Sequence, residues 1–307
     1  MTSIVFLGPR GSFSEAALHE LQESRGAELI PGGSVAEAMS ALRAGTADRA
    51  LVPIENSIEG SVATTLDGLS VGEPLVIVAE QVIPVSFTLM APAGVSLGDI
   101  RTVGTHPHAS AQCSQWVRSN LPQAGVIPLG STSAAAAALA AGDAGFEAAI
   151  APRIAADIYG LDVLADDIGD NHEAWTRFVL LAREGNLTAP SGADKTTLTL
   201  FMRADHPGAL MEILTEFAVR GVNLTRIESR PTRKALGDYF FSVDCEGHVN
   251  DARVGEALAG LHRICADVRF LGSYPRHDGR QPLVREGVTD ADFRDAEQWL
   301  RSIRGDV

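Results

Sequence analysis

The pattern of apolar residues changes once along this chain, and the change falls at residues 185–195, EGNLTAPSGAD. This stretch is rich in glycine, proline and small polar residues, a composition typical of a loop between periodic segments. The 307 residues are enough for about two domains of roughly 150 residues each. We therefore predict domains over residues 1–185 and 196–275, a linker over 186–195, and a charged tail over 276–307.

The segment before the linker alternates short apolar runs with helix-like stretches. Strands are predicted over residues 4–7, 49–54, 75–79, 85–91, 148–151 and 178–181. Helices are predicted over residues 12–23, 34–45, 106–119 and 134–141, three of them beginning at or just after a capping serine. The alanine run at 134–138 indicates a tightly packed helix, because alanine is the best helix former. This alternation favours an α/β fold.

The segment after the linker has a second, more compact pattern. Strands are predicted over residues 196–202, 222–228, 237–245 and 268–271. Two helices are indicated by apolar residues at helical spacing, namely Leu210, Ile213, Leu214 and Phe217, then Val254, Leu258, Leu261 and Cys265. The resulting order βαββαβ is that of a ferredoxin-like domain. The tail contains one predicted helix, over residues 292–303, to which the sequence assigns no role.

Charge and cysteine content narrow the class of protein. Asp and Glu total 39 against 25 Lys and Arg, which gives a net charge of −14. A chain this acidic is a poor binder of nucleic acid or anionic membranes. Its three cysteines, Cys113, Cys245 and Cys265, are far apart, so neither a disulfide framework nor a zinc site is expected. With no signal peptide or membrane span in the sequence, we expect a cytoplasmic protein.

Three segments at predicted strand ends are rich in small, hydroxyl or amide residues. They are residues 8–14, GPRGSFS; 55–61, ENSIEGS; and 131–133, STS. Each precedes or caps a helix, where free N–H groups and the helix dipole favour carboxylates or phosphates. Simple capping explains any one of them, whereas three in one domain also suggest an anion site. Neither a Walker loop nor a GxGxxG fingerprint is present, and His106 and His108 are interpreted as a helix start at Pro107 rather than a metal site.

Taken in order, these segments resemble the prephenate dehydratase family. The matching motifs are GPRGSFS at 8–14, VPIENSIEGSV at 52–62, THPHASAQC at 105–113, STSAAA at 131–136 and TRF at 176–178. The second pattern resembles the ACT regulatory domain, with GAL at 208–210 and NLTRIESRP at 223–231. The resemblance implies a two-lobed catalytic region similar to type II periplasmic-binding proteins, followed by a ferredoxin-like ACT domain. It also implies conversion of prephenate to phenylpyruvate without a metal or organic cofactor, in a homodimer or dimer-based homotetramer.

The resemblance assigns the central catalytic role to Thr176, as a hydrogen-bond donor to the departing ring oxygen. Arg177 and Phe178 belong to the same catalytic motif. Arg177 could pair with a substrate carboxylate or hold the loop through a buried carboxylate, and we favour the second role. Phe178 is expected to pack under the loop rather than to contact the substrate. Donors to the substrate are expected at Ser12, Asn56, Ser57, Thr105 and Gln112. For Glu55 we prefer a buried ionic partner over a general acid, because another carboxylate beside a dianion is repulsive unless it is paired. The family often has an asparagine two or three residues before TRF, whereas here Asn171 stands five residues before Thr176.

In the ACT region the resemblance implies a site for phenylalanine as feedback inhibitor. Its expected residues are Gly208, Ala209, Leu210, Asn223, Leu224, Glu228, Ser229 and Arg230. Leu210 and Leu224 are also suited to core packing. Such sites commonly lie between subunits, and phenylalanine acts as an allosteric ligand only if it binds two conformational states differently.

Three other functions compete with this interpretation. A solute-binding protein shares the two-lobed fold, but the missing signal peptide and the TRF motif argue against it. A pure amino-acid sensor would carry a degenerate first domain, which the intact motifs contradict. Arogenate dehydratase differs only in an amino group of the substrate, and the sequence does not separate it from prephenate dehydratase.

Overall fold

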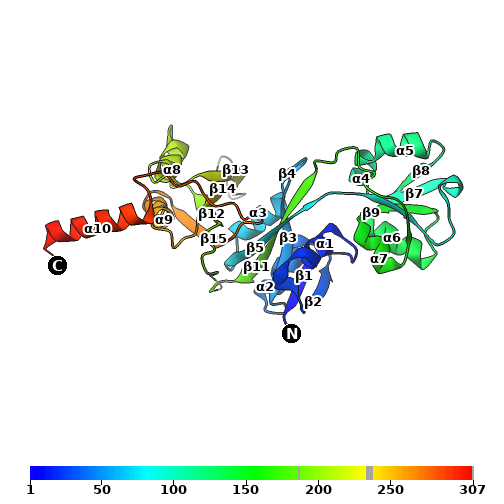
Figure 1. Cartoon of the computed structure of the whole chain (residues 1–307), viewed down its shortest axis with the longest axis horizontal. Helices are drawn as coiled ribbons and strands as arrows, with labels where there is room; N and C mark the ends of the chain where they lie inside the picture. The colour runs from blue at the N-terminus through cyan, green and yellow to red at the C-terminus, as the bar shows by residue number, and fades with distance from the viewer. Residues whose placement is uncertain (186, 233–237, 306–307) are drawn as a thin grey trace. The chain divides into compact units, whose positions relative to one another are not determined.

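The chain divides into two compact units that interleave along the sequence. A computed structural model describes residues 1–185, 187–232 and 238–305. The first unit comprises residues 1–65 and 81–180, and the second comprises 66–80 and 181–307. The second unit therefore takes a short segment from inside the N-terminal half of the sequence (Figure 1).

The first lobe of the first unit is built on a sheet with strand order β2-β1-β3-β11-β5, and β4 pairs with β3. Its strands are β1 (Ser3–Leu7), β2 (Glu28–Gly32), β3 (Arg49–Asn56), β4 (Gly60–Ser61), β5 (Leu75–Pro84) and β11 (Trp175–Arg183). Strand β1 is parallel to both β2 and β3. Helices α1 (Phe13–Glu20) and α2 (Val35–Arg43) belong to this lobe, with a 3-10 turn at Gln22–Ser24, whereas α3 (Ala63–Ser70) has most of its residues in the second unit.

The second lobe is formed by one continuous stretch of chain around a five-stranded sheet of order β10-β6-β9-β7-β8. Its strands are β6 (Thr88–Ala91), β7 (Thr102–Thr105), β8 (Gly125–Pro128), β9 (Ala148–Ala151) and β10 (Asp162–Ala165). Its helices are α4 (Pro107–Gln112), α5 (Ser114–Asn120), α6 (Thr132–Ala141) and α7 (Arg153–Tyr159), with a 3-10 turn at Leu97–Asp99. Apolar clusters pack around this sheet, one including Leu89, Val103 and Ile150 and another including Met90, Ala135 and Ala149.

The predicted capping serines begin their helices as expected. The Oγ of Ser34 accepts from the Glu37 amide at 3.1 Å and that of Ser131 from the Ala134 amide at 3.0 Å. Helix α6 then buries Ala135 and Ala136 completely, which confirms that the alanine run is a packing feature. Gly142 ends this helix with φ of 83°, the left-handed conformation that glycine adopts without strain.

The predicted helix over residues 106–119 is two helices, which corrects the sequence-based expectation. Helix α4 ends before Cys113, whose φ and ψ are −114° and 11°, and α5 begins at Ser114. The Asp170 carboxylate accepts from the backbone amides of Gln115 and Trp116, and this distant residue caps the first turn of α5. The break follows from a contact made by a residue more than fifty positions away, which local periodicity does not reveal.

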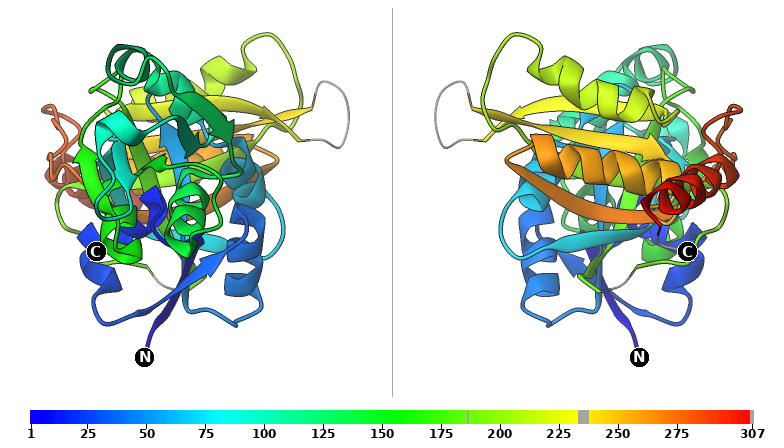
Figure 2. Two further views of the ribbon diagram at one scale, coloured as in Figure 1. Left: turned by 90° about the vertical axis from the view of Figure 1, so that its right-hand side faces the viewer. Right: turned by 90° about the vertical axis from the view of Figure 1, so that its left-hand side faces the viewer.

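The second unit contains a four-stranded antiparallel sheet of order β13-β14-β12-β15. Its elements are β12 (Asp194–Phe201), α8 (Ala209–Ala218), β13 (Leu224–Pro231), β14 (Tyr239–Glu246), α9 (Ala252–Ile264) and β15 (Asp267–Pro275), followed by α10 (Asp290–Arg304). Helices α8 and α9 pack on one face of the sheet through a core that includes Ile213, Phe217, Val254 and Leu261 (Figure 2). This is the predicted βαββαβ order.

Some predictions differ from the observed elements. Periodicity did not reveal β2, β4, α3, β7, β8, α7 or β10, and the strand predicted over residues 268–271 continues to Pro275 as β15. Gly237, the predicted start of one strand, and Asn186, within the predicted linker, lie outside the described residues. The tail helix is present, from Asp290 to Arg304. Across the part of the chain that the structure describes, no helix combines the length and apolar character needed to cross a membrane.

Candidate functional site

A cavity of about 300 Å³ lies between the two lobes of the first unit, and we call it the cleft cavity. Its size suits a small-molecule ligand. Each of the three segments singled out at strand ends contributes at least one lining residue. The lining residues are Phe13, Asn56, Glu59, Val85, Phe87, His106, His108, Ala109, Gln112, Gly130, Ser131, Thr132 and Thr176.

Asn56, at the end of β3, connects the backbone of the following turn to Thr176. Its Oδ1 accepts from the backbone amides of Ile58 at 2.9 Å and Glu59 at 3.0 Å. These two bonds orient the side chain, so that Nδ2 donates to the Thr176 Oγ1 at 2.9 Å. A hydroxyl that accepts in this way keeps its own proton available for another partner. Thr176 is thereby prepared to donate into the cavity.

The loop that follows β3 is held against β11 by Ser57. The backbone amide of Ser57 donates to the Trp175 carbonyl at 2.9 Å. In return, the Ser57 Oγ accepts from the Trp175 amide at 2.9 Å. These reciprocal bonds join the residues next to Asn56 and Thr176, and they fix the separation of the two functional side chains.

Arg177 and Phe178 follow Thr176 along β11, and both are buried. Successive side chains of a strand point to opposite faces, so Arg177 is directed away from the side that Thr176 occupies. Its Nη1 lies 3.5 Å from the Glu55 Oε2. The Arg177 side chain is 8% exposed and that of Glu55 41% exposed. Glu55 is therefore an ionic partner as predicted, but its own side chain is only partly buried.

The remaining predicted substrate donors occupy different positions relative to the cleft cavity. Gln112 lines it. Thr105 is buried and its hydroxyl donates to the Ile150 carbonyl at 2.7 Å. Ser12 caps α1 and its hydroxyl donates to the Leu7 carbonyl at 3.0 Å. Thr105, Ser12 and Ser57 are not among the residues that line the cavity.

Two features of the cleft cavity, one polar and one apolar, determine which kind of ligand it suits. Ser131 and Thr132 bring the N-terminus of the ten-residue helix α6 to one wall, and the positive end of a helix dipole favours carboxylates. Phe13 and Phe87 supply an apolar wall, with ring centroids 5.6 Å apart at an interplanar angle of 84°. An adjoining cavity shares Gly130 and Ser131 and includes Arg10. The cleft therefore suits a ring that carries negative charge.

The sequence motifs predict no part in the site for His106 and His108. The expected helix start is confirmed, because α4 begins at Pro107 with His106 as its N-cap. Both imidazoles nevertheless line the cleft cavity, and the His108 Nδ1 lies 2.7 Å from the Glu59 Oε1. The sequence signal for this was indirect: Glu59 stands in a candidate anion-site segment, and the two histidines stand in the 105–113 motif, which also holds the expected donors Thr105 and Gln112.

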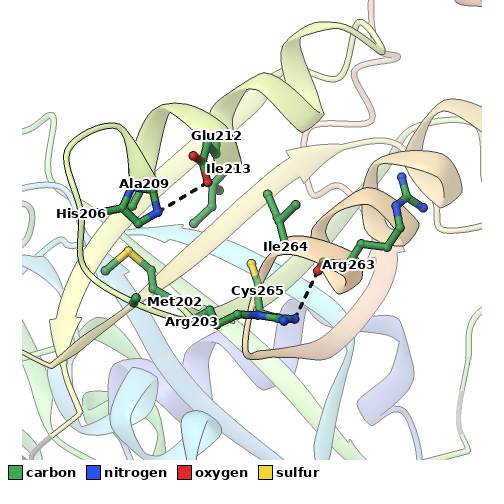
Figure 3. A pocket seen from close by; sticks show the side chains of 10 residues that line it. Met202, Arg203, His206, Ala209, Glu212, Ile213, Arg263, Ile264 and Cys265 are labelled. Carbon is green, nitrogen blue, oxygen red and sulfur yellow. Dashed lines mark hydrogen bonds and ion pairs between the residues drawn. The ribbon is translucent and has the colours of Figure 1, made fainter.

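In the second unit, a cavity of about 340 Å³ lies between the start of α8 and the end of α9 (Figure 3). We call it the α8–α9 cavity. His206 Nε2 lies 3.7 Å from the Glu212 Oε2 at its edge, and Arg203 donates to the carbonyl oxygens of Arg263 and Cys265, each at 3.2 Å. Burial raises the pKa of the Cys265 thiol to about 11.

The predicted phenylalanine-site residues fall in two places within the second unit. Gly208, Ala209 and Leu210 form the start of α8, with Gly208 at φ of 97°, and Ala209 lines the α8–α9 cavity. The other group, Asn223, Leu224, Glu228, Ser229 and Arg230, lies on or just before β13, an edge strand. Leu224 packs on the core. Arg230 pairs with Asp67 at 3.0 Å and with Glu228 at 3.4 Å.

These features define a class of protein: a two-lobed α/β unit with a polar cleft, followed along the chain by a ferredoxin-like βαββαβ domain. A family model described as prephenate dehydratase matches residues 4–186, and one described as ACT domain matches residues 196–263. Prephenate dehydratase of Amycolatopsis methanolica is 45% identical over 305 residues, covering 99% of this chain and 98% of its own length. The chain belongs to the prephenate dehydratase family.

Two solved structures resemble this chain over most of its length. Prephenate dehydratase from Arthrobacter aurescens, in complex with L-Phe, has a TM-score of 0.93 and 51% sequence identity, covering 99% of this chain and 100% of its own. GqqA, described as a novel type of quorum quenching acylase, has a TM-score of 0.80 and 29% identity, covering 89% of this chain and 97% of its own.

Proposed function

We propose that the cleft cavity catalyses the decarboxylative dehydration of prephenate to phenylpyruvate, carbon dioxide and water. The bond between the ring and its carboxylate breaks, and its electron pair enters the ring as the hydroxyl group departs. The departing oxygen takes up a proton and leaves as water, and the ring becomes aromatic. The enzyme therefore has to hold a dianion in a fixed orientation and assist departure of the hydroxyl group.

The hydrogen bond between Asn56 and Thr176 is the observation that carries this proposal. Because the Thr176 Oγ1 accepts from the Asn56 amide at 2.9 Å, its proton is available for the departing ring oxygen of the substrate. A threonine hydroxyl is a weak acid, so we assign Thr176 the role of hydrogen-bond donor or proton relay. Gln112, on another wall of the same cavity, supplies a second donor.

The other predicted residues support this arrangement from outside the cavity. Ser57 holds the Asn56 loop on β11, and the ion pair of Arg177 with Glu55 joins β11 to β3. Phe178 is packed beneath the strand. We assign Ser12 and Thr105 positioning roles, because their hydroxyls donate to backbone carbonyls within their own lobes.

We assign residues 1–185 to the catalytic domain, 186–195 to the linker, 196–275 to the ACT domain and 276–307 to the tail. The L-Phe bound in the Arthrobacter aurescens relative supports feedback inhibition of this enzyme by phenylalanine. The expected site residues divide between the start of α8 and the edge strand β13. This division supports a site shared by two copies in a homodimer or dimer-based tetramer. A biosynthetic role supports a cytoplasmic location.

Turnover of prephenate and of arogenate, measured separately with and without phenylalanine, tests the proposal. We expect phenylpyruvate from prephenate, at a rate that phenylalanine lowers. Thr176→Val should lower kcat by about 100-fold, because the donor is lost. The matched control is Thr46→Val, which removes a hydroxyl that donates to the Ala41 carbonyl. Full activity of folded Thr176→Val would exclude the assigned role, and turnover of arogenate alone would change the substrate.

The likeness to GqqA makes acylase activity the rival outcome. Acyl transfer by a hydroxyl requires a base that removes its proton. The Thr176 hydroxyl instead accepts from an amide donor, which favours donation over nucleophilic attack. Hydrolysis of an N-acylated substrate by the wild-type protein, abolished by Thr176→Val, would favour the rival.

A further inference from the structure

We propose that the His108 imidazole binds one carboxylate of the dianionic substrate. When no substrate is bound, the Glu59 carboxylate pairs with this imidazole in its place. The inference rests on the proposed function, since it requires an anionic substrate in the cleft cavity. It adds a substrate-binding residue and an internal competitor to the motif residues already assigned.

The composition of the cavity wall is the first observation. Among the residues that line the cleft cavity, none is lysine or arginine, and His106 and His108 alone can carry positive charge. Glu59 is the one carboxylate in the same lining. Since the chain as a whole has a net charge of −14, a dianion must be attracted by local groups. The two imidazoles and the start of α6 are the groups available for this.

The geometry of the pair is the second observation. Glu59 lies in the turn between β3 and β4 of the first lobe, and His108 lies in the first turn of α4 in the second lobe. The His108 Nδ1 and the Glu59 Oε1 are 2.7 Å apart, with side chains 65% and 53% exposed. The pair thus crosses the cleft and remains open to solvent, where such pairs contribute little stability. Replacing the Glu59 carboxylate by one from the substrate therefore costs little.

The surrounding contacts direct both groups at the cavity. The Glu59 amide is held by the Asn56 Oδ1 at 3.0 Å, so its position depends on the residue that orients Thr176. The His108 amide donates to the His106 Nδ1 at 3.3 Å, and the two rings lie 5.1 Å apart. His106 and Glu59 are the titratable groups that face His108 from the cavity lining, and Arg10 in the adjoining cavity pairs with Glu15. Substrate binding would exchange one carboxylate for another at His108.

The test is to replace His108 and Glu59 separately, because the two substitutions should change KM in opposite directions. We expect His108→Gln to raise KM for prephenate about tenfold with kcat within about twofold, because ground-state binding is lost. We expect Glu59→Gln to lower KM about threefold, because the competing carboxylate is removed. In the His108→Gln background, Glu59→Gln should have no further effect on KM. His108→Arg should keep KM within about threefold of wild type, because a carboxylate-binding cation is restored.

A second pair of the same chemistry provides the control. His172 and Asp167 also form an exposed imidazole–carboxylate pair, at 3.1 Å with side chains 64% and 60% exposed, and neither lines the cavity. His172→Gln should leave KM unchanged. Circular dichroism and thermal unfolding establish that each variant is folded, and His108→Arg carries the test if His108→Gln does not fold.

Three results would overturn the inference. A shift of KM in the same direction for Glu59→Gln and His108→Gln would indicate a structural latch between the lobes. An unchanged KM in both would mean that the substrate does not contact His108, and a KM for folded His108→Arg raised as far as for His108→Gln would mean that charge is not what the site requires. Wild-type turnover of prephenate is measured first, so that its absence, which removes the proposed function, is distinguished from these patterns.

Discussion

At the scale of single residues, Asn56 serves two purposes with one side chain. Its amide oxygen accepts hydrogen bonds from two backbone amides of the turn, and its amide nitrogen donates a hydrogen bond to the Thr176 hydroxyl. Asn56→Asp keeps an acceptor for the turn but cannot donate to Thr176 while ionised. We expect kcat to fall about 100-fold with a small change in thermal midpoint, as measured by steady-state kinetics and calorimetry. If Asn56→Asp lowered stability and activity in proportion, the role of Asn56 in the turn could not be separated from its role toward Thr176, and the prediction would be wrong.

Gly11 shows how closely the loop after β1 approaches the second lobe within the first unit. Its φ is 78°, and an added Cβ would lie 3.0 Å from the Cα and Cβ of Ala155. The Ser133 hydroxyl also donates to its carbonyl at 2.9 Å. We expect Gly11→Ala to lower the free energy of unfolding by about 2–3 kcal/mol, from backbone strain and overpacking together.

Gly26 is the matched control for that substitution. Its φ is 73°, but nothing lies within 4 Å of an added Cβ. Gly26→Ala should therefore cost only the strain, about 1–2 kcal/mol. Urea unfolding of both variants measures the difference, and equal costs would show that the contact with Ala155 contributes nothing.

The Arg276–Asp278 pair predicts a pH dependence of stability. Two hydrogen bonds from the Arg276 guanidinium, at 2.9 and 2.7 Å, lower the pKa of the Asp278 carboxyl to about 2. A carboxyl whose pKa is lower in the folded state stabilises the fold fully above its unfolded pKa of about 3.9, and the stabilisation is lost as the pH falls through the folded-state value of about 2.

Because the Asp278 side chain is 51% exposed, solvent screening limits the contribution to at most about 1 kcal/mol. Asp278→Asn should lower the free energy of unfolding by up to this amount at pH 7 and by much less near pH 2, where the carboxyl is about half protonated in the folded state. Denaturant unfolding at the two pH values measures it. Asp267→Asn, from a pair 3.9 Å apart, is the control, and a pH-independent loss in Asp278→Asn would contradict the electrostatic origin.

At the scale of elements, α3 and β13 are joined by an ion pair inside the second unit. The Arg230 Nε and Nη2 donate to the Asp67 Oδ1 at 3.1 and 3.0 Å, and both side chains are mostly buried. We expect Asp67→Asn to cost about 2–3 kcal/mol, because it leaves the guanidinium with less compensation. A double-mutant cycle with Arg230→Met by urea unfolding should give a coupling energy above about 1 kcal/mol. Additive effects would mean that the pair is not coupled.

Periodicity predicted elements well where the pattern was local and poorly where it was not. The amphipathic helix α8 was predicted from Leu210, Ile213 and Phe217, although Leu210 itself is 40% exposed. Strand β8 was missed because its four residues, Gly125–Pro128, are exposed or only partly buried and carry glycine and proline. The break between α4 and α5 depends on Asp170, a contact that no local window contains.

The site was predictable in its motif residues but not in its spatial contacts. The motifs named Asn56, Gln112 and Thr176, which line one cavity. They gave no indication that Glu59 and His108, 49 positions apart in the sequence, would lie within 2.7 Å. That contact depends on the placement of the two lobes, which neither spacing nor composition encodes.

At the scale of the whole molecule, the second unit depends on residues 66–80 as well as on the C-terminal part of the chain. Lys195 Nζ lies 3.0 Å from both carboxylate oxygens of Glu80, and both side chains are nearly buried. We expect a chain cleaved at a protease site introduced between residues 189 and 190 to elute as one species in size-exclusion chromatography. Glu80→Gln should weaken this association, because it removes the charge partner of a buried ammonium. Separate elution of the wild-type fragments would contradict the prediction.

The interleaving of the two units also orders events during synthesis. Strand β11 stands between β3 and β5, so the first sheet cannot close until residues 175–183 have left the ribosome. The second lobe, from β6 to β10, is one uninterrupted stretch with its own core, and domains generally fold as their residues emerge. The second lobe can thus fold before β11, the strand that pairs with both β3 and β5, has been synthesised. In the nascent chain, the middle of the sequence would therefore reach its folded structure before the N-terminal part does.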